Sequence, residues 1–152
     1  MASIDHVDLV VGSLERSLPF YRDLLRPLGW RGPHEVTGER GETIHYLWNL
    51  TWFGSIGLRE RQSDAGPTPY DRYSIGIHHL ALRARSRRHV DERARWLAER
   101  GAEIESGPRE YDYTPAYYAV FFYDPDGLKL EIVHRPRGGA RFLRRLVRRR
   151  GG

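Results

Sequence analysis

The stretch "YYAVFFYDPDGLKLEIVH" (117–134) reads as two strands joined by a tight turn, and it decides the fold. Aromatic and β-branched residues flank the turn residues "DPDG". An antiparallel hairpin closed at the Pro-Asp step pairs Tyr123 with Leu128 and Val120 with Glu131. It places Glu131 on the strand face opposite its apolar neighbours. A carboxylate there is costly to bury unless it is paired or coordinated to a metal.

The same order of elements is expected twice along the chain. A strand at 3–12 precedes a helix at 13–29, and a strand at 75–84 precedes a helix at 86–101. Each helix is opened by a serine, a favoured N-cap residue. Three more strands follow each helix, at 29–37, 42–50 and 52–61 and again at 102–111, 116–124 and 128–135. An internal repeat of this kind predicts two similar structural modules.

We therefore predict an α+β fold made of two βαβββ modules in tandem, with helices on the outside of a mixed sheet. Module one spans about 3–61 and module two about 74–135. A polar stretch rich in Gly, Pro and Asp is read as a linker at 62–73. The remaining residues form a basic C-terminal tail at 136–152.

Overlay of the two modules aligns His6 with His79 and not with His78. Neighbouring residues of a strand point to opposite faces, so we expect His78 to face the helices as a structural residue. His79 is then expected on the face that carries His6 and Glu131. Two imidazoles and one carboxylate form a facial triad, which suits Fe, Mn, Ni or Zn.

The chain resembles the vicinal oxygen chelate superfamily over about residues 3–135. The resemblance rests on "DHVDLVVGSLERSLPFYRDLL" (5–25), "GIHHLAL" (76–82) and the hairpin at 117–134. This superfamily includes glyoxalase I, extradiol dioxygenases, fosfomycin-resistance enzymes, methylmalonyl-CoA epimerase and bleomycin-binding proteins. The resemblance implies a cup-shaped sheet around a divalent metal, with ligands at His6, His79 and Glu131. It also implies a homodimer.

Glyoxalase-type members have a fourth ligand, a Glu on the last strand of the first module. Depending on the alignment, that position falls here on Leu58, Arg59 or Glu60. Only Glu60 could bind a metal. A site with three ligands is therefore the favoured reading, with Glu60 left open as a fourth.

Aromatic residues are concentrated on the segments expected to line the cup. On the hairpin pairing given above, Tyr117, Phe121 and Tyr123 face the helices. The residues that remain as candidates for a substrate pocket are Trp48, Tyr113, Tyr118 and Phe122. Such a pocket suits a small aromatic or apolar ligand.

Charge is unevenly distributed along the chain. The net charge is +5, but the tail alone holds seven Arg and no acidic residue, which leaves residues 1–135 at −2. No nucleic-acid partner is therefore expected for the folded body. A short basic helix in the tail could lie on an anionic membrane, contact nucleic acid or dock on a partner subunit, but a frayed extension is the favoured interpretation. The absence of cysteine excludes disulfides and thiolate metal sites. With no membrane span or leader peptide, a cytoplasmic location is expected.

These observations predict a divalent-metal-dependent enzyme acting on a small substrate with vicinal oxygens. The metal would act as a Lewis acid in dioxygenase, lyase, isomerase or transferase chemistry. No catalytic residue is assigned by the sequence. The alternative is a resistance protein of the same fold that binds an antibiotic or metabolite without turnover.

Overall fold

The computed structural model describes residues 4–51, 54–65 and 70–136. The basic tail beyond residue 136 and part of the predicted linker lie outside these ranges. Among the described residues, no helix is long and apolar enough to span a membrane. The chain divides into two compact units. Unit 1 comprises residues 1–78 and the turn 123–128, and unit 2 comprises residues 79–122 and 129–152.

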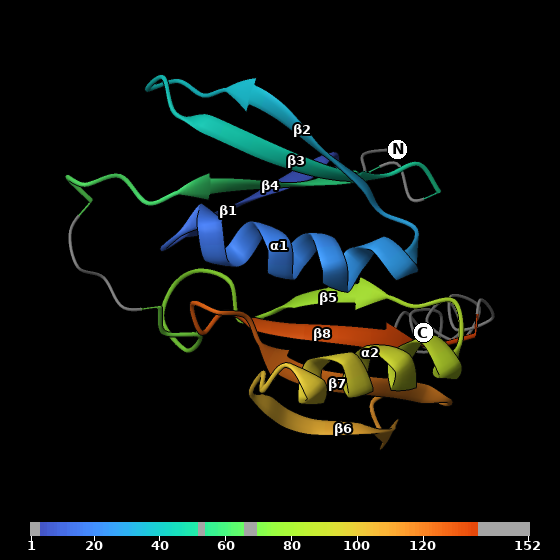
Figure 1. Cartoon of the computed structure of the whole chain (residues 1–152). Helices are drawn as coiled ribbons and strands as arrows, with labels where there is room; N and C mark the ends of the chain where they lie inside the picture. Colours follow the sequence, from blue (N-terminus) through green and yellow to red (C-terminus); the bar gives the residue numbers. More distant parts are fainter. Residues whose placement is uncertain (1–3, 52–53, 66–69, 137–152) are drawn as a thin grey trace, which may run out of the picture. The chain divides into compact units, whose positions relative to one another are not determined.

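Unit 1 contains the first βαβββ module (Figure 1). Its sheet has the strand order β1-β4-β3-β2, with β1 parallel to β4 and the other pairs antiparallel. Its elements are β1 (His6–Val11), α1 (Leu14–Leu25), the 3-10 helix η1 (Arg26–Leu28), β2 (Arg31–Thr37), β3 (Thr43–Asn49) and β4 (Gly54–Glu60).

Unit 2 repeats this topology, with the strand order β5-β8-β7-β6 and β5 parallel to β8. The predicted fold of two βαβββ modules is thus confirmed. The elements of unit 2 are β5 (Leu80–Arg83), α2 (Arg87–Glu99), β6 (Ile104–Tyr111), β7 (Tyr117–Tyr123) and β8 (Lys129–His134).

Both helices begin at the predicted serines. The Ser13 hydroxyl accepts a hydrogen bond from the Arg16 N–H, and the Ser86 hydroxyl accepts one from the His89 N–H. Each bond satisfies one of the free N–H groups at a helix N-terminus. Gly29 ends η1 in the left-handed conformation, at φ 93°, which an L-residue with a side chain rarely adopts.

Apolar side chains that face each helix form the two cores. In unit 1 they include Leu9, Leu24, Leu25, Ile56 and Leu58. In unit 2 they include Val90, Leu97, Phe122, Leu130 and Ile132. Because side chains alternate along a strand, the other face of each sheet carries a different set of residues. Those two faces hold His6, Trp48 and Glu131 among the predicted site residues.

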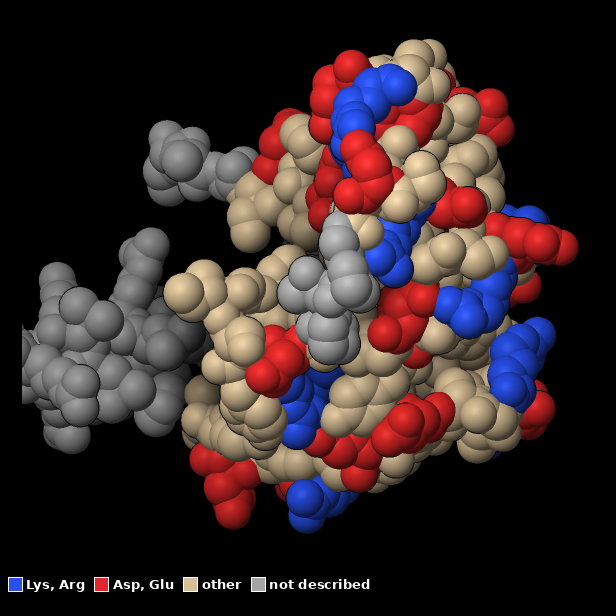
Figure 2. Space-filling view, turned by 90° about the vertical axis from the view of Figure 1, so that its left-hand side faces the viewer, with Lys and Arg blue, Asp and Glu red and all other residues tan. Residues whose placement is uncertain are grey.

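The described residues expose both acidic and basic side chains to solvent. Acidic and basic side chains are interspersed over the face shown in Figure 2. This agrees with the nearly balanced charge of residues 1–135.

Candidate functional site

A buried carboxylate in unit 2 is paired with a histidine. Glu131 lies on β8 and is only 1% exposed, although its side chain is ionisable. Its Oε2 lies 3.2 Å from Nε2 of His79. Glu131 pairs with Ala81 in the β5–β8 register, so His79, two residues earlier, lies on the same face. The predicted proximity of these two side chains is therefore observed.

The second partner of Glu131 is a tyrosine that sequence analysis assigned to helix packing. The Tyr117 hydroxyl donates to Oε1 of Glu131 at 2.5 Å. Burial, and then this hydrogen bond, raise the pKa of Tyr117, so the hydroxyl stays protonated and remains a donor. The carboxylate thus has one oxygen held by Tyr117 and the other directed to His79.

Aromatic side chains surround this pair on the same face of unit 2. The His79 ring is edge-on to Phe121, with centroids 6.1 Å apart. Phe121 forms a buried cluster with Ala119 and Val133. The side chains of Tyr111 and Tyr117 pack against this cluster. Tyr113 is exposed; it stacks on Tyr111 and is edge-on to Tyr117. Of the predicted pocket residues in unit 2, Tyr113 lies beside the Glu131 face.

The face predicted for Tyr118 and Phe122 is wrong. The Tyr118 hydroxyl donates to Asp91 of α2 at 2.7 Å, and Phe122 is fully buried in the core. The cause is the hairpin turn, which closes through a hydrogen bond from the Asp124 N–H to the Leu128 carbonyl. The predicted register paired Tyr123 with Leu128 instead. A slip of one residue moves every side chain of a strand to the other face.

A longer turn is stabilised by side-chain contacts that a turn motif does not reveal. Oδ1 of Asp124 accepts hydrogen bonds from the N–H groups of Asp126 and Leu128, at 2.9 and 2.8 Å. Its Oδ2 accepts from the Tyr21 hydroxyl of α1 at 2.7 Å. The turn is therefore held by a helix that lies about a hundred residues earlier in the chain, within unit 1.

The first histidine, His6, lies on β1 in unit 1 and is partly exposed. Its Nδ1 lies 2.9 Å from Oδ1 of Asp5, and this hydrogen bond raises the pKa of His6. A carboxylate on one ring nitrogen fixes the tautomer and leaves the other nitrogen, Nε2, available as a ligand. The His6 ring is also edge-on to Tyr46, with centroids 5.9 Å apart.

Strand register arranges the His6 face of unit 1 in rows. His6 pairs with Ser55, which pairs with Trp48. Paired residues of neighbouring strands share a face, so the predicted pocket residue Trp48 lies on the His6 side of the sheet. Its side chain is 38% exposed there. Asp8, Gly57 and Tyr46 form the next row.

The register corrects the search for a fourth ligand. Glu131 pairs with Ala81, two residues after His79, and Gly57 pairs with Asp8, two residues after His6. The counterpart of Glu131 is therefore Gly57, and not Leu58, Arg59 or Glu60. Glu60 lies on the helix side, where its Oε2 accepts from the Leu14 N–H at the start of α1. Its carboxylate stabilises the helix N-terminus.

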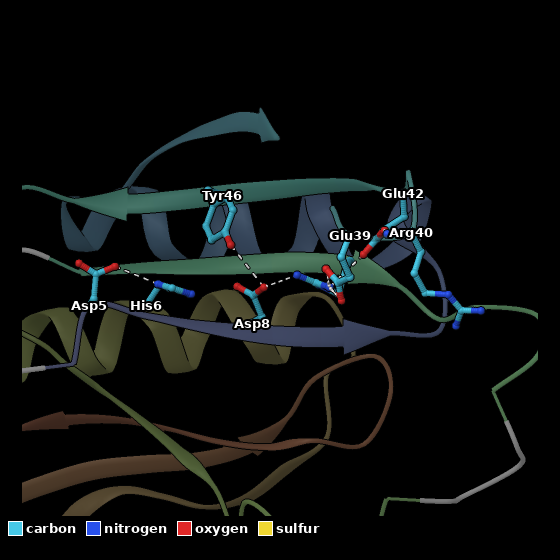
Figure 3. A network of polar contacts seen from close by, with 8 residues as sticks. Asp5, His6, Asp8, Glu39, Arg40, Glu42 and Tyr46 are labelled. Carbon is cyan, nitrogen blue, oxygen red and sulfur yellow. Dashed lines mark hydrogen bonds and ion pairs between the residues drawn. The ribbon is translucent and has the colours of Figure 1, made fainter. Parts of the chain in front are cut away.

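The space above Gly57 is filled by the carboxylate of Asp8. A Cβ placed on Gly57 would lie 2.3 Å from Oδ1 of Asp8 and 2.8 Å from the Tyr46 ring. Oδ1 is buried and has no hydrogen-bond partner among the described residues. Oδ2 accepts from the Tyr46 hydroxyl at 3.3 Å and from Nη2 of Arg59 at 2.6 Å (Figure 3).

Arg59 links Asp8 to two further carboxylates. Its Nη1 lies 3.0 Å from Glu39 and 2.9 Å from Glu42. Hydrogen bonds that Arg59 donates, first to Glu39 and then to Asp8, raise the pKa of Arg59. The guanidinium therefore stays charged and neutralises the Asp8 carboxylate.

His78, the first histidine of the adjacent pair at 78–79, lies outside the core. His78 is exposed, precedes β5 and is edge-on to Tyr73. The prediction that it faces the helices as a structural residue is wrong, because β5 begins only at Leu80. Within residues 4–51, 54–65 and 70–136, no three His, Cys, Asp or Glu side chains are grouped so as to hold a metal ion.

Comparison with known sequences supports the predicted relationship. A sequence model of the Glyoxalase/Bleomycin resistance protein/Dioxygenase superfamily matches residues 3–132. The chain is 28% identical over 129 residues to the uncharacterized protein YqjT of Bacillus subtilis, covering 84% of this chain and 95% of YqjT. It is 29% identical to YwkD of the same organism, over 87% of this chain and 96% of YwkD.

Solved structures of similar proteins agree with this fold. A putative glyoxalase from Bacillus halodurans matches with a TM-score of 0.71 and 29% identity, over 87% of this chain and 95% of that one. A glyoxylase/bleomycin resistance protein/dioxygenase domain from Frankia sp. EAN1pec matches with a TM-score of 0.73 and 25% identity, over 91% and 95%. The fosfomycin resistance protein FosX from Listeria monocytogenes, at 18% identity and a TM-score of 0.59 over 90% and 93%, shares the fold.

Proposed function

Because the chain belongs to the Glyoxalase/Bleomycin resistance protein/Dioxygenase superfamily, we propose that it is a divalent-metal-dependent enzyme. His6, His79 and Glu131 are the proposed ligands, and a small molecule with vicinal oxygens is the proposed substrate. The observation that carries the proposal is the pair in unit 2. Glu131 is buried, carries no cationic Lys or Arg partner among the described contacts, and directs one oxygen to Nε2 of His79.

The chemistry of this donor set fits a metal ion. A buried carboxylate is costly unless it is paired or coordinated to a metal ion. Imidazole nitrogen and carboxylate oxygen together suit Fe, Mn, Ni or Zn. His6 contributes the third donor through Nε2, since its Nδ1 is engaged with Asp5. When bound, the metal would supply a Lewis acid for the substrate oxygens.

The residues around the ligands have defined roles in this proposal. Tyr117 holds the Glu131 carboxylate in one orientation as a hydrogen-bond donor. This outer contact tunes ligand geometry and affinity. Trp48 on the His6 face and Tyr113 beside the Glu131 face are the aromatic surfaces proposed to contact the substrate. Gly57 and the neutralised Asp8 supply no fourth ligand, which leaves coordination positions open for substrate.

The test is metal content, measured by mass spectrometry on protein purified without a His-tag and after addition of each metal. Wild type is expected to hold one equivalent of Fe, Mn, Ni or Zn. His79→Ala and Glu131→Gln are expected to lose it, whereas the control His34→Ala, an exposed histidine of β2, retains it. A wild type that takes up none of these ions would refute the enzyme proposal.

A second candidate function is binding of an aromatic drug or metabolite without turnover. The aromatic cluster of Tyr111, Tyr113, Tyr117 and Phe121 favours it. Binding of bleomycin, measured by equilibrium dialysis, would then be unaffected by EDTA and by His79→Ala. Binding that disappears with the chelator would favour the metal-dependent function. In both cases we propose a homodimer, to be checked by light scattering.

A further inference from the structure

Unit 1 contains a cavity of about 220 Å³ at the point where α1 ends and the chain passes through η1 to β2. Its apolar lining includes Leu25 and Leu47, which are buried, and the half-buried Trp30. An apolar cavity of about 150 Å³ is enough to hold benzene. This cavity therefore has room for a single aromatic ring with a small substituent, and not for a nucleotide.

The polar lining of the cavity is entirely cationic. Arg22, Arg26 and Arg31 contribute to it from α1, η1 and β2. No Asp or Glu is among the residues that line it. Three like charges around a hollow of low polarity repel one another, and the repulsion is relieved when an anion enters.

These arginines differ in their partners from three other arginines of unit 1. Arg16, Arg40 and Arg59 each form ion pairs with carboxylates that are distant in sequence. In the described part of the chain, Arg26 has no carboxylate partner, and the side chain of Arg31 donates to the Trp30 carbonyl at 3.0 Å.

Arg22 has a carboxylate partner, but its bond leaves the end of the side chain available. Its Nε donates to the neighbouring Asp23 at 2.9 Å, a contact that does not involve the terminal amino groups of the guanidinium. The α1 C-terminus would favour basic residues at Arg22 and Arg26 through the helix dipole. The dipole does not account for Arg31, which lies on β2.

We propose that this cavity binds a small aromatic anion. Arg26 and Arg31 would pair with its carboxylate or phosphate group, for which the guanidinium fork is well suited. Trp30 and the leucines would contact its ring. Leu47 lines the cavity, whereas its neighbours Tyr46 and Trp48 lie on the His6 face of the sheet. Because neighbouring residues of a strand point to opposite faces, the cavity is separate from the proposed metal site.

The test is calorimetric titration of the full chain with phenyl phosphate and with benzoate. Benzamide supplies the ring without the charge, and inorganic phosphate supplies the charge without the ring. At least one aromatic anion is expected to bind about tenfold more tightly than either control. The double variant Arg26→Gln/Arg31→Gln is expected to weaken this binding by about tenfold, whereas the exposed Arg95→Gln on α2 leaves it unchanged.

Thermal unfolding of each variant separates binding from stability. Removing the two charges relieves repulsion, so the double variant is expected to melt no lower than wild type. The proposal is overturned if neither anion binds saturably at about 10 mM. Equal binding by wild type and the double variant overturns it too, as does a double variant that melts lower while binding is unchanged. That last result would assign the two arginines a structural role only.

Discussion

Units 1 and 2 have the same topology, but they place their carboxylates on different strands. In unit 1 the acid is Asp8 on β1, opposite the small residue Gly57 of β4. In unit 2 the acid is Glu131 on β8, opposite the small residue Ala81 of β5. In each row one strand supplies the carboxylate and its neighbour leaves the space for it.

A tyrosine donates to the carboxylate in both units, Tyr46 from β3 and Tyr117 from β7. The difference lies in the cation. Arg59 neutralises Asp8, whereas Glu131 faces His79. The comparison teaches that a repeated fold can place one acid in a closed ion-pair network and the other beside a histidine.

The largest expected effect comes from making unit 1 resemble unit 2 through Gly57→Glu. The new side chain would overlap Asp8 and Tyr46, and should lower the free energy of unfolding by about 3 kcal/mol. In an Asp8→Ala background the closest contact is gone and only the Tyr46 ring must shift, so the same change should cost about 1 kcal/mol or less. Urea unfolding of the four proteins measures this coupling. Equal costs in the two backgrounds would show that Asp8 does not fill the position.

Removal of the cation that distinguishes unit 1 should have the next largest effect. Arg59→Leu leaves Asp8 and Glu42, both largely buried, without their ion pair, and we expect a loss of about 2 kcal/mol in unfolding free energy. Arg40→Leu is the matched control, because its pair with Asp64 is exposed and should contribute about 0.5 kcal/mol or less. Similar losses of unfolding free energy in the two variants would show that the ion pairs of Arg59 contribute no more than an exposed ion pair.

The two tyrosines allow a direct comparison of the units. Tyr117→Phe removes a donor from the buried Glu131 and should cost about 1.5 kcal/mol. Tyr46→Phe removes a longer bond to the partly exposed Asp8 and should cost about 0.5 kcal/mol. Thermal and urea unfolding of both variants check the order. The reverse order would mean that Glu131 does not depend on its tyrosine.

The smallest expected effect concerns Asp124 in the turn between β7 and β8. This turn belongs to unit 1, although most of both strands belongs to unit 2. Burial raises the pKa of Asp124 from 3.8 despite its hydrogen bonds. The folded protein then binds this proton more tightly than the unfolded chain does. Stability is therefore lost as pH rises from the unfolded pKa through the raised folded pKa.

The side chain introduced by Asp124→Asn cannot ionise, so this variant should lose the pH-dependent contribution to stability. Wild type is expected to lose stability relative to the variant as the pH rises from 3.8, the ordinary pKa of Asp, through the raised pKa of the folded state. Urea unfolding at a series of pH values measures the difference. A difference that does not change with pH would contradict the assigned shift.

Much of the fold could be predicted from local sequence. Ser13 and Ser86 mark the helix starts because an N-cap needs only its own turn of helix. The repeat aligned His6 with His79 because the elements follow one another in the same order in both modules. The approach of His79 to Glu131 followed from their strands and faces alone.

Predictions that depended on strand register were less successful. Side chains alternate with a period of two, so an error of one residue in the hairpin reversed the faces of Tyr117 and Tyr118. The turn length depends on Asp124, whose carboxylate is fixed by Tyr21 of a different element. No turn motif contains that contact.

The amino-acid sequence by itself determined the two βαβββ modules, their caps and the histidine–glutamate pair of unit 2, because local periodicity and a repeat carry that information. Tertiary structure alone decided that Gly57, not Glu60, is the counterpart of Glu131. It also decided that Asp8 is neutralised by Arg59, and that Arg26 and Arg31 meet around a cavity. Each of these depends on contacts between different strands or helices, which only the folded chain brings together.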